Sequence, residues 1–123
     1  MFIRDIFAQK KPVLSFEVFP PKKDSGLDNV ISAVDELSKM PIDYMSVTYG
    51  AGGGNVGANR EVCQMIKKAG TTPVTHFTVI KNTKEGIKEQ LDQYLAEGVD
   101  HMLALRCPQA LSASFCQAQT TPV

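Results

Sequence analysis

The sequence has no excess of either charge and no long hydrophobic run. Thirteen basic residues balance thirteen acidic ones in 123 residues, whereas nucleic-acid and anionic-membrane binders normally carry a basic excess. No apolar run approaches the ~20 residues that a membrane-spanning helix needs. The first twelve residues carry charges within their apolar stretch, unlike a secretory signal peptide. We therefore expect no nucleic-acid partner, no membrane association and no export signal.

Cysteine is scarce, and its spacing disfavours two kinds of site. The chain has only Cys63, Cys107 and Cys116, an odd number without a CxxC pair. A disulfide framework or a zinc site is therefore not expected, and a reducing cytoplasm fits this composition. The two histidines, His76 and His101, have no second ligand at metal-binding spacing, so we expect no metal.

What the sequence does have is a recurring unit of about thirty residues, the length of a strand followed by a crossover helix. Apolar and β-branched runs predict strands at residues 13–19, 44–49, 73–80 and 99–105. Apolar positions at helical spacing predict three helices between them. The first helix begins at a capping box formed by Ser25 and Asp28, and its apolar stripe is Leu27, Val30, Ile31, Val34 and Leu37. The second helix spans residues 60–69. The third is capped by Asn82 or Thr83, and its apolar stripe is Ile87, Leu91, Tyr94 and Leu95. Gly70 and Gly98 are expected to end the last two.

Alternating strands and helices imply parallel strands joined by right-handed crossovers. This order fits either a doubly wound α/β sheet or a (β/α)8 barrel. A barrel needs roughly 200 residues or more, so a chain with four predicted strands would correspond to about half of one.

The composition changes abruptly after Arg106. All 26 charged residues lie within residues 1–106, and residues 107–123 hold two of the three cysteines. We therefore divide the chain into a patterned part, 1–106, and an uncharged tail, 107–123, with no clear period. The tail is either a natural flexible terminus or the product of a changed reading frame, and we favour the second interpretation.

Glu17 is a carboxylate in the middle of the first predicted strand, between Phe16 and Val18. Burying an ionised carboxylate is costly, so we expect either a raised pKa or a partner. It also lies near the carboxyl end of the strand, where barrel enzymes place catalytic groups. The alternative is an ordinary strand glutamate with one face in solvent.

Three further features follow the next strands. The glycines of residues 50–54 would let a ligand approach the backbone closely, or would form an ordinary loop. His76 lies inside the third strand and is either structural or a ligand contact. Arg106 follows the fourth strand and would bind a phosphate or carboxylate, or end the strand in solvent. Together with Glu17 and Thr48–Tyr49, these residues fall at the carboxyl ends of successive parallel strands, which form the ligand crevice in both candidate folds.

Four motifs then resemble one enzyme family in order and spacing. SFEVFPPK at residues 15–22, SVTYGAGG at 46–53, PVTHFT at 73–78 and HMLALR at 101–106 are similar to motifs of methylenetetrahydrofolate reductase. No single motif would be specific, but the combination covers nearly all of the patterned part.

The resemblance implies the first four units of a (β/α)8 barrel and a flavoprotein of one-carbon and methionine metabolism. Such an enzyme passes a hydride from NADH or NADPH through FAD to 5,10-methylenetetrahydrofolate, giving 5-methyltetrahydrofolate. By motif match, Glu17 would be the general acid that opens the folate ring. Thr48 would contact the nicotinamide cofactor. The FAD would be lined by Tyr49, Ala51, His76 and Arg106.

The chain departs from the family pattern at the same point as the composition changes. After Arg106 the family continues with Gly-Asp, where this chain has Cys107-Pro108-Gln109. The remaining four units of the barrel have no counterpart here. A half barrel leaves two strand edges open, so we expect marginal stability and self-association. Two alternatives therefore stay open: a non-catalytic truncated or frameshifted part of that enzyme, and another phosphate- or flavin-binding barrel.

Overall fold

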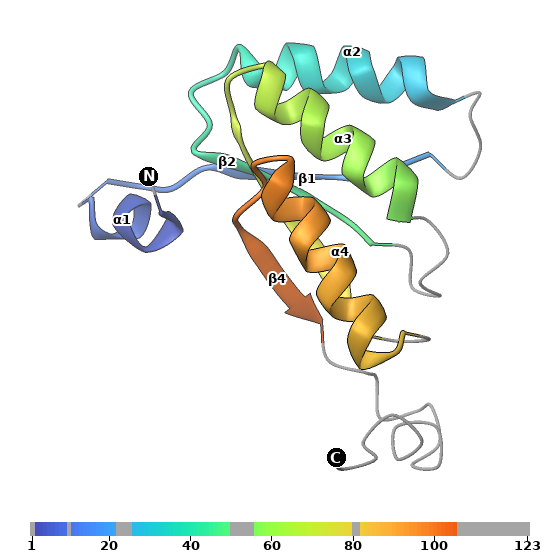
Figure 1. Cartoon of the computed structure of the whole chain (residues 1–123). Coiled ribbons are helices and arrows are strands. Elements are labelled where there is room, and N and C mark those ends of the chain that lie inside the picture. The colour runs from blue at the N-terminus through green and yellow to red at the C-terminus, as the bar shows by residue number, and fades with distance from the viewer. Residues whose placement is uncertain (1, 10, 22–25, 50–55, 80–81, 106–123) are drawn as a thin grey trace, which may run out of the picture.

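The protein's computed structural model describes residues 2–9, 11–21, 26–49, 56–79 and 82–105. Four parallel strands form one sheet, and three of the helices cover one of its faces (Figure 1). In chain order the elements are α1 (Ile3–Ala8), β1 (Ser15–Val18), α2 (Leu27–Ser38), β2 (Tyr44–Val47), α3 (Val56–Lys68), β3 (Thr72–Thr78), α4 (Lys84–Ala96) and β4 (Met102–Leu105).

The predicted alternation of parallel strands and helices is confirmed. The strands lie in the order β1-β2-β3-β4, so each crossover leads to the next strand in the sheet. A doubly wound sheet instead reverses its strand order and carries helices on both faces. The four described strands therefore follow the winding of a barrel, while closure into a full (β/α)8 barrel stays a prediction. Neither β1 nor β4 has a second strand neighbour among the described residues.

The core lies between the sheet and helices α2, α3 and α4. Met45 and Val47 of β2 are fully buried on this face, whereas Tyr44 and Ser46 alternate with them and are only partly buried. The alternation follows from the two-residue period of a strand. The core cluster is completed by Val18 of β1, Phe77 of β3, Val34 of α2, Val62, Cys63 and Ile66 of α3, Tyr94 of α4, and the loop residues Tyr49 and Val99.

The predicted ends of α3 and α4 are confirmed by backbone geometry. Gly70 and Gly98 have φ angles of +87° and +75°, a left-handed conformation that favours glycine after a helix. Thr83 caps α4, because its hydroxyl accepts a hydrogen bond from the Gly86 N–H at 3.1 Å. These signals are local, which is why the sequence alone reveals them.

Three details of the helices differ from expectation. Gly26 occupies the N-cap of α2 without a side-chain cap, so the predicted capping box is not the start of this helix; Ser25 lies outside the described residues. Helix α3 begins at Val56, one turn before the predicted start. Leu95 and Ile31 were expected on the packing stripes of α4 and α2, but they are 61% and 42% exposed, and neither belongs to the core cluster.

Helix α1 was not predicted, because it is only six residues long and precedes the first repeat. Its Ile6 is 3% exposed. The ring of Phe7 lies edge-on to that of Tyr44, with centroids 6.5 Å apart, and the ring of Phe2 lies 6.0 Å from that of His101. Helix α1 therefore packs near the amino-terminal ends of the strands.

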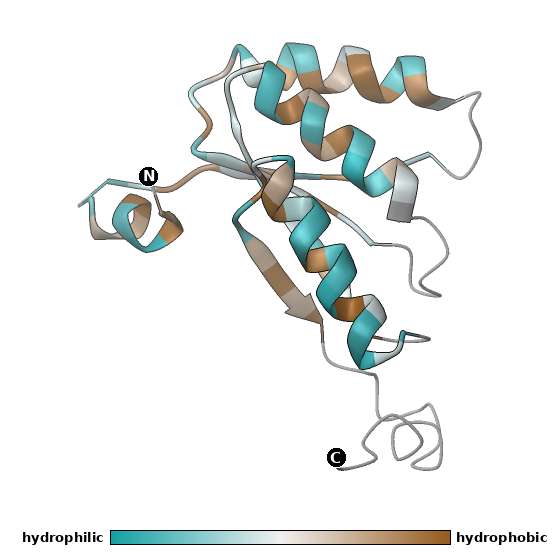
Figure 2. Ribbon diagram, viewed as in Figure 1, coloured by the Kyte–Doolittle hydropathy of each residue, from teal (hydrophilic) through white to brown (hydrophobic). Residues whose placement is uncertain are grey.

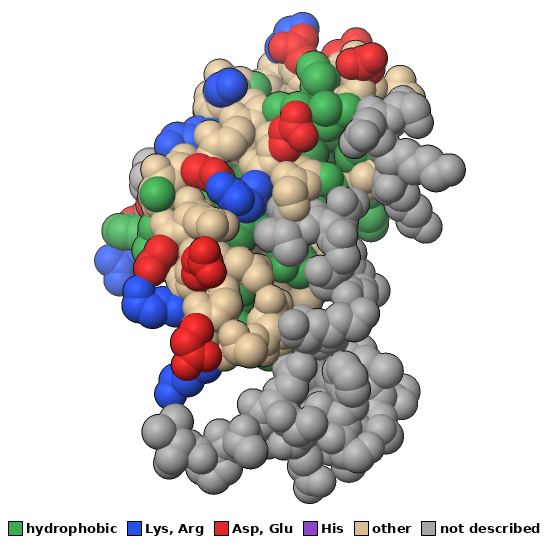
Figure 3. Space-filling model, turned by 45° about the vertical axis from the view of Figure 1, so that its right-hand side comes forward, with side chains coloured by type: hydrophobic (Ala, Val, Ile, Leu, Met, Phe, Trp, Pro, Cys, Tyr) green, Lys and Arg blue, Asp and Glu red, His purple; other side chains and the backbone are tan. Residues whose placement is uncertain are grey.

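The surface is mixed in character. Figure 3 shows acidic and basic side chains interspersed with apolar ones over the described part of that face, so that neither charge forms a continuous patch there. Strand β4 is apolar in Figure 2, yet all four of its residues are exposed. In the described part of the chain, no helix has the length and apolar character needed to cross a membrane.

Candidate functional site

A cavity of about 860 Å³ lies on the face of the sheet opposite α2, α3 and α4; we call it the inner-face cavity. Its walls come from alternate residues of the strands and from the start of the chain. They include Ser15, Glu17, Ser46, Val74, His76 and Leu103 from the sheet and Phe2, Ile3 and Arg4 at the α1 end. The cavity thus combines apolar walls with a few polar groups, as small-molecule sites commonly do.

Glu17 and His76 meet in this cavity. The Oε2 atom of Glu17 lies 3.7 Å from Nε2 of His76, although the two residues are far apart in the sequence. The register explains the contact: Glu17 pairs with Ser46 in β2, and Ser46 pairs with Val74 in β3, two residues before His76. The fold therefore brings an imidazole close to the Glu17 carboxyl group.

Glu17 is not buried, and its exposure agrees with the alternative of a strand glutamate with one face in solvent. Its side chain is 48% exposed, whereas that of His76 is 11% exposed. The difference follows from their strands: β1 lies at the edge of the sheet, and β3 lies between β2 and β4. An exposed carboxylate beside an enclosed imidazole remains accessible to a ligand that enters the cavity.

Thr48 and Tyr49 follow β2 directly, but they are held in different ways. The Thr48 N–H donates to the Val18 carbonyl at 3.1 Å, which extends the contact between β1 and β2. The Tyr49 ring is 3% exposed and packs against Phe77 with centroids 5.8 Å apart. Its hydroxyl donates to Oε1 of Gln90 in α4 at 3.0 Å, and burial raises its pKa. The Tyr49 side chain therefore points into the helix-side core, and only its backbone is left to face a ligand.

Two other predicted site residues, Ala51 and Arg106, lie outside the described residues, as does the glycine segment 50–55. Their predicted roles stay predictions. Within the described ranges, no three His, Cys, Asp or Glu side chains gather as metal ligands would.

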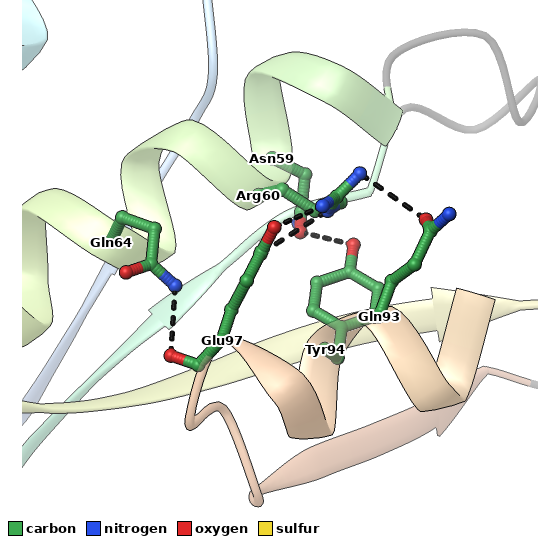
Figure 4. A network of polar contacts seen from close by, with 6 residues as sticks. All are labelled: Asn59, Arg60, Gln64, Gln93, Tyr94 and Glu97. Carbon is green, nitrogen blue, oxygen red and sulfur yellow. Dashed lines mark hydrogen bonds and ion pairs between the residues drawn. The ribbon is translucent and has the colours of Figure 1, made fainter. Parts of the chain in front are cut away.

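Sequence reasoning missed a buried polar residue behind the site, Asn59 of α3. It is 0% exposed, and Figure 4 shows it between α3 and the Tyr94 ring. Asn59 shares the apolar face of α3 with Val62, Cys63 and Ile66, at helical spacings of three, four and seven residues. A polar residue on an otherwise apolar helical face was the available signal.

Next to Asn59, a second set of contacts joins α3 to α4 (Figure 4). The Arg60 guanidinium donates to both carboxylate oxygens of Glu97 and to Oε1 of Gln93. The Gln64 amide and the Lys67 ammonium donate to the Glu97 carbonyl at 3.0 and 3.1 Å. These contacts hold the carboxyl end of α4 against α3, and thereby fix the entry into β4.

Comparison with known proteins agrees with the fold and the motifs. The family model of methylenetetrahydrofolate reductase matches residues 2–119. This chain belongs to the methylenetetrahydrofolate reductase family. It is 38% identical over 93 residues to a 5,10-methylenetetrahydrofolate reductase of Buchnera aphidicola and 33% identical over 94 residues to that of Pectobacterium carotovorum. It is 30% identical over 105 residues to a probable methylenetetrahydrofolate reductase (NADH) of Oryza sativa.

The chain spans only part of these reductases. The alignments cover 75–85% of this chain, but 32% of each bacterial reductase and 18% of the rice protein. The relatives compared are named as reductases.

Proposed function

We propose that this chain forms the amino-terminal half of a (β/α)8 reductase barrel that binds FAD and contributes Glu17 to the reduction of 5,10-methylenetetrahydrofolate by NADH or NADPH. The observation that carries the proposal is the Glu17–His76 pair, 3.7 Å apart on the inner face of a sequentially wound parallel sheet. Family membership supports the reaction class. A strand order that continues around a barrel would cover the open edges of β1 and β4.

The flavin would bind at the part of the inner-face cavity nearest the carboxyl ends of the strands, beside His76 and Leu103. The whole cavity, about 860 Å³ in volume, extends from there to Phe2 and Arg4 near the amino-terminal ends of the strands. Val74 and Leu103 offer apolar walls, and Ser46 and His76 offer hydrogen-bonding groups. When bound, FAD would supply the hydride-carrying chemistry. In this proposal His76 holds the flavin, Thr48 contacts the nicotinamide cofactor, and Tyr49 contributes through its backbone.

Glu17 would hold the proton for the folate. As a general acid, its Oε2 atom would protonate a ring nitrogen of 5,10-methylenetetrahydrofolate, so that the carbon–nitrogen bond opens toward the reactive iminium. Half exposure leaves the carboxyl group accessible to the substrate. The separation of 3.7 Å from His76 exceeds a normal hydrogen bond, so the carboxyl group is not hydrogen-bonded to the imidazole and stays free to reach a substrate.

The test is the visible spectrum of the purified full chain after incubation with FAD and desalting. We expect a retained flavin band that NADH bleaches under anaerobic conditions and that methylenetetrahydrofolate restores. A His76→Ala variant should lose the band, whereas Lys88→Gln, a change on the exposed face of α4, should retain it. A colourless wild-type chain would contradict the proposal and favour a non-catalytic part of the enzyme.

A further inference from the structure

Asn59 uses the full hydrogen-bonding capacity of its side chain. Its Nδ2 group donates to the carbonyls of Val47 and Thr48 at 3.2 and 3.0 Å. Its Oδ1 atom accepts from the Tyr94 hydroxyl at 2.7 Å. The Thr75 hydroxyl lies 2.8 Å from the same oxygen and 3.0 Å from the His76 carbonyl, and it shares its single proton between them. Two carbonyls can only accept, so the orientation of the amide follows from its partners.

These contacts connect the two ends of one loop. Val47 ends β2, Thr48 follows it, and Asn59 lies in the first turns of α3. The chain between them includes the glycine segment that resembles the family's cofactor-binding motif. Thr48 lies beyond the end of β2, where a backbone carbonyl loses its regular partner in the sheet, whereas Val47 still pairs with Thr75 of β3. The Asn59 amide donates to both carbonyls from a position that is 0% exposed.

The same side chain extends the connection to the rest of the site. Thr75 immediately precedes His76 in β3, and Tyr94 belongs to α4. A single amide thus links the end of β2, the strand of His76 and helix α4. On the other side of β2, the Thr48 N–H is held by Val18, the residue after Glu17.

We propose that Asn59 is a positioning residue that fixes Thr48 relative to Glu17 and His76 by holding the two carbonyls at the end of β2. The functional part of this inference rests on the proposed function, in which Thr48 contacts the nicotinamide cofactor. Asn59 itself touches no ligand. It acts through the backbone of residues 47 and 48.

Asn59→Asp is the most informative variant, because it replaces the side-chain amide by a carboxyl group of nearly the same size. The carboxylate can still accept from Tyr94 and Thr75, but it cannot donate to the two carbonyls. Tyr94→Phe is the matched control: it removes a hydrogen bond from the same network and leaves both carbonyl contacts in place. Asn59→Asp also places a carboxylate beside two carbonyl oxygens in a buried position, so its loss of stability is expected to exceed that of Tyr94→Phe. Each variant is therefore corrected for its global stability before the two are compared.

The first readout needs no cofactor. In the full chain, hydrogen exchange of the Thr48 amide should accelerate at least tenfold more in Asn59→Asp than in Tyr94→Phe, after each is corrected for its global stability. Equal acceleration would overturn the proposal. If Asn59→Asp does not fold, the test is made by hydrogen exchange on the wild-type chain. The side-chain amide protons of Asn59 should exchange far more slowly than those of the exposed Asn29. Equal exchange would overturn it.

The second readout is flavin reduction by NADH in the FAD-loaded chain. Asn59→Asp should raise the KM for NADH about tenfold, equivalent to about 1.4 kcal/mol, with the rate at saturating NADH unchanged. Tyr94→Phe should leave KM unchanged. An unchanged KM in Asn59→Asp would overturn the functional part of the inference. If the wild-type chain takes up no flavin, the proposed function fails, and the exchange measurement alone decides whether Asn59 positions Thr48.

Discussion

The Oε2 atom of Glu17 lies 3.7 Å from Nε2 of His76, and β2 separates the strands that carry them. A carboxyl group that is half exposed thus faces an imidazole that is largely enclosed. The parallel register creates this pair, because it places alternate residues of β1, β2 and β3 on one face. The proposed function places its chemistry on this inner face of the sheet.

Replacing Glu17 by Gln should separate the two half-reactions of the proposed enzyme. We expect flavin reduction by NADH to survive, since it needs no proton from this carboxyl group. Folate reduction should fall by roughly 10²- to 10⁴-fold, the usual contribution of a general acid. Stopped-flow absorbance of the flavin measures both steps. Glu89→Gln, on the exposed face of α4, is the control; equal loss of both steps, or of neither, would reject general-acid catalysis by Glu17.

Asp43 should make folding sensitive to acid. A hydrogen bond from Lys11 and another from the Leu14 N–H lower the pKa of Asp43 below its ordinary value of 3.8. A lowered pKa in the folded state stabilises the protein above the unfolded-state pKa, and the contribution is lost as the pH falls through the folded-state pKa.

Asp43→Asn should therefore be less stable than wild type at neutral pH, and the difference should shrink as the pH falls below 3.8. Urea unfolding from pH 7 to pH 2 measures this dependence. Glu89→Gln serves as the control. A difference that stays constant across this range would show that the ionised carboxylate contributes nothing through its charge.

The Arg60–Glu97 pair should couple α3 to α4 measurably. The hydrogen bond to Glu97 raises the pKa of Arg60, and the side chains are 30% and 29% exposed. A double-mutant cycle with Arg60→Met and Glu97→Gln should give a coupling energy of about 0.5–1 kcal/mol in urea unfolding. The Lys88–Asp92 pair, with side chains 77% and 59% exposed, should give about 0.3 kcal/mol. If the coupling energy of Arg60 and Glu97 is no larger than that of Lys88 and Asp92, the Arg60–Glu97 pair does not join α3 to α4 as described.

Cys63 should be unreactive in the folded chain. Burial raises the pKa of its thiol to about 12, and the thiolate is the reactive form. In a Cys107→Ser, Cys116→Ser background, labelling by a thiol reagent at pH 8 should be roughly a thousandfold slower than for a free cysteine. Labelling should reach completion in urea. Rapid labelling without denaturant would show that α3 opens readily, or that the thiol is not buried.

The sequence predicted structural features correctly where the conformation or chemistry of a single residue determines them. Gly70 and Gly98 mark helix ends because few other residues adopt positive φ without strain. Thr83 caps its helix with its own hydroxyl. Glu17 and His76 stood out as polar residues in apolar strands, and the structure brings both into one cavity.

Other features depend on which surfaces meet, and the chain does not encode these locally. Leu95 follows the apolar stripe of α4 in the sequence, and yet it is 61% exposed. The inward orientation of Tyr49 depends on Gln90 and Phe77, which lie far along the chain. The sequence shows Asn59 only as a polar residue on an otherwise apolar helical face, because its partners come from β2, β3 and α4 and meet it only in the folded chain.

The sequence by itself determined the alternation of strands and helices, because hydrophobic periodicity and turn residues act within a few positions. It also carried the motifs by which the family is recognised. Only the tertiary structure decided that the strands follow one another in order under helices on one face. It alone brought Glu17 to His76 and closed the Asn59 network, because such contacts arise from strand register and helix packing between segments distant in the chain.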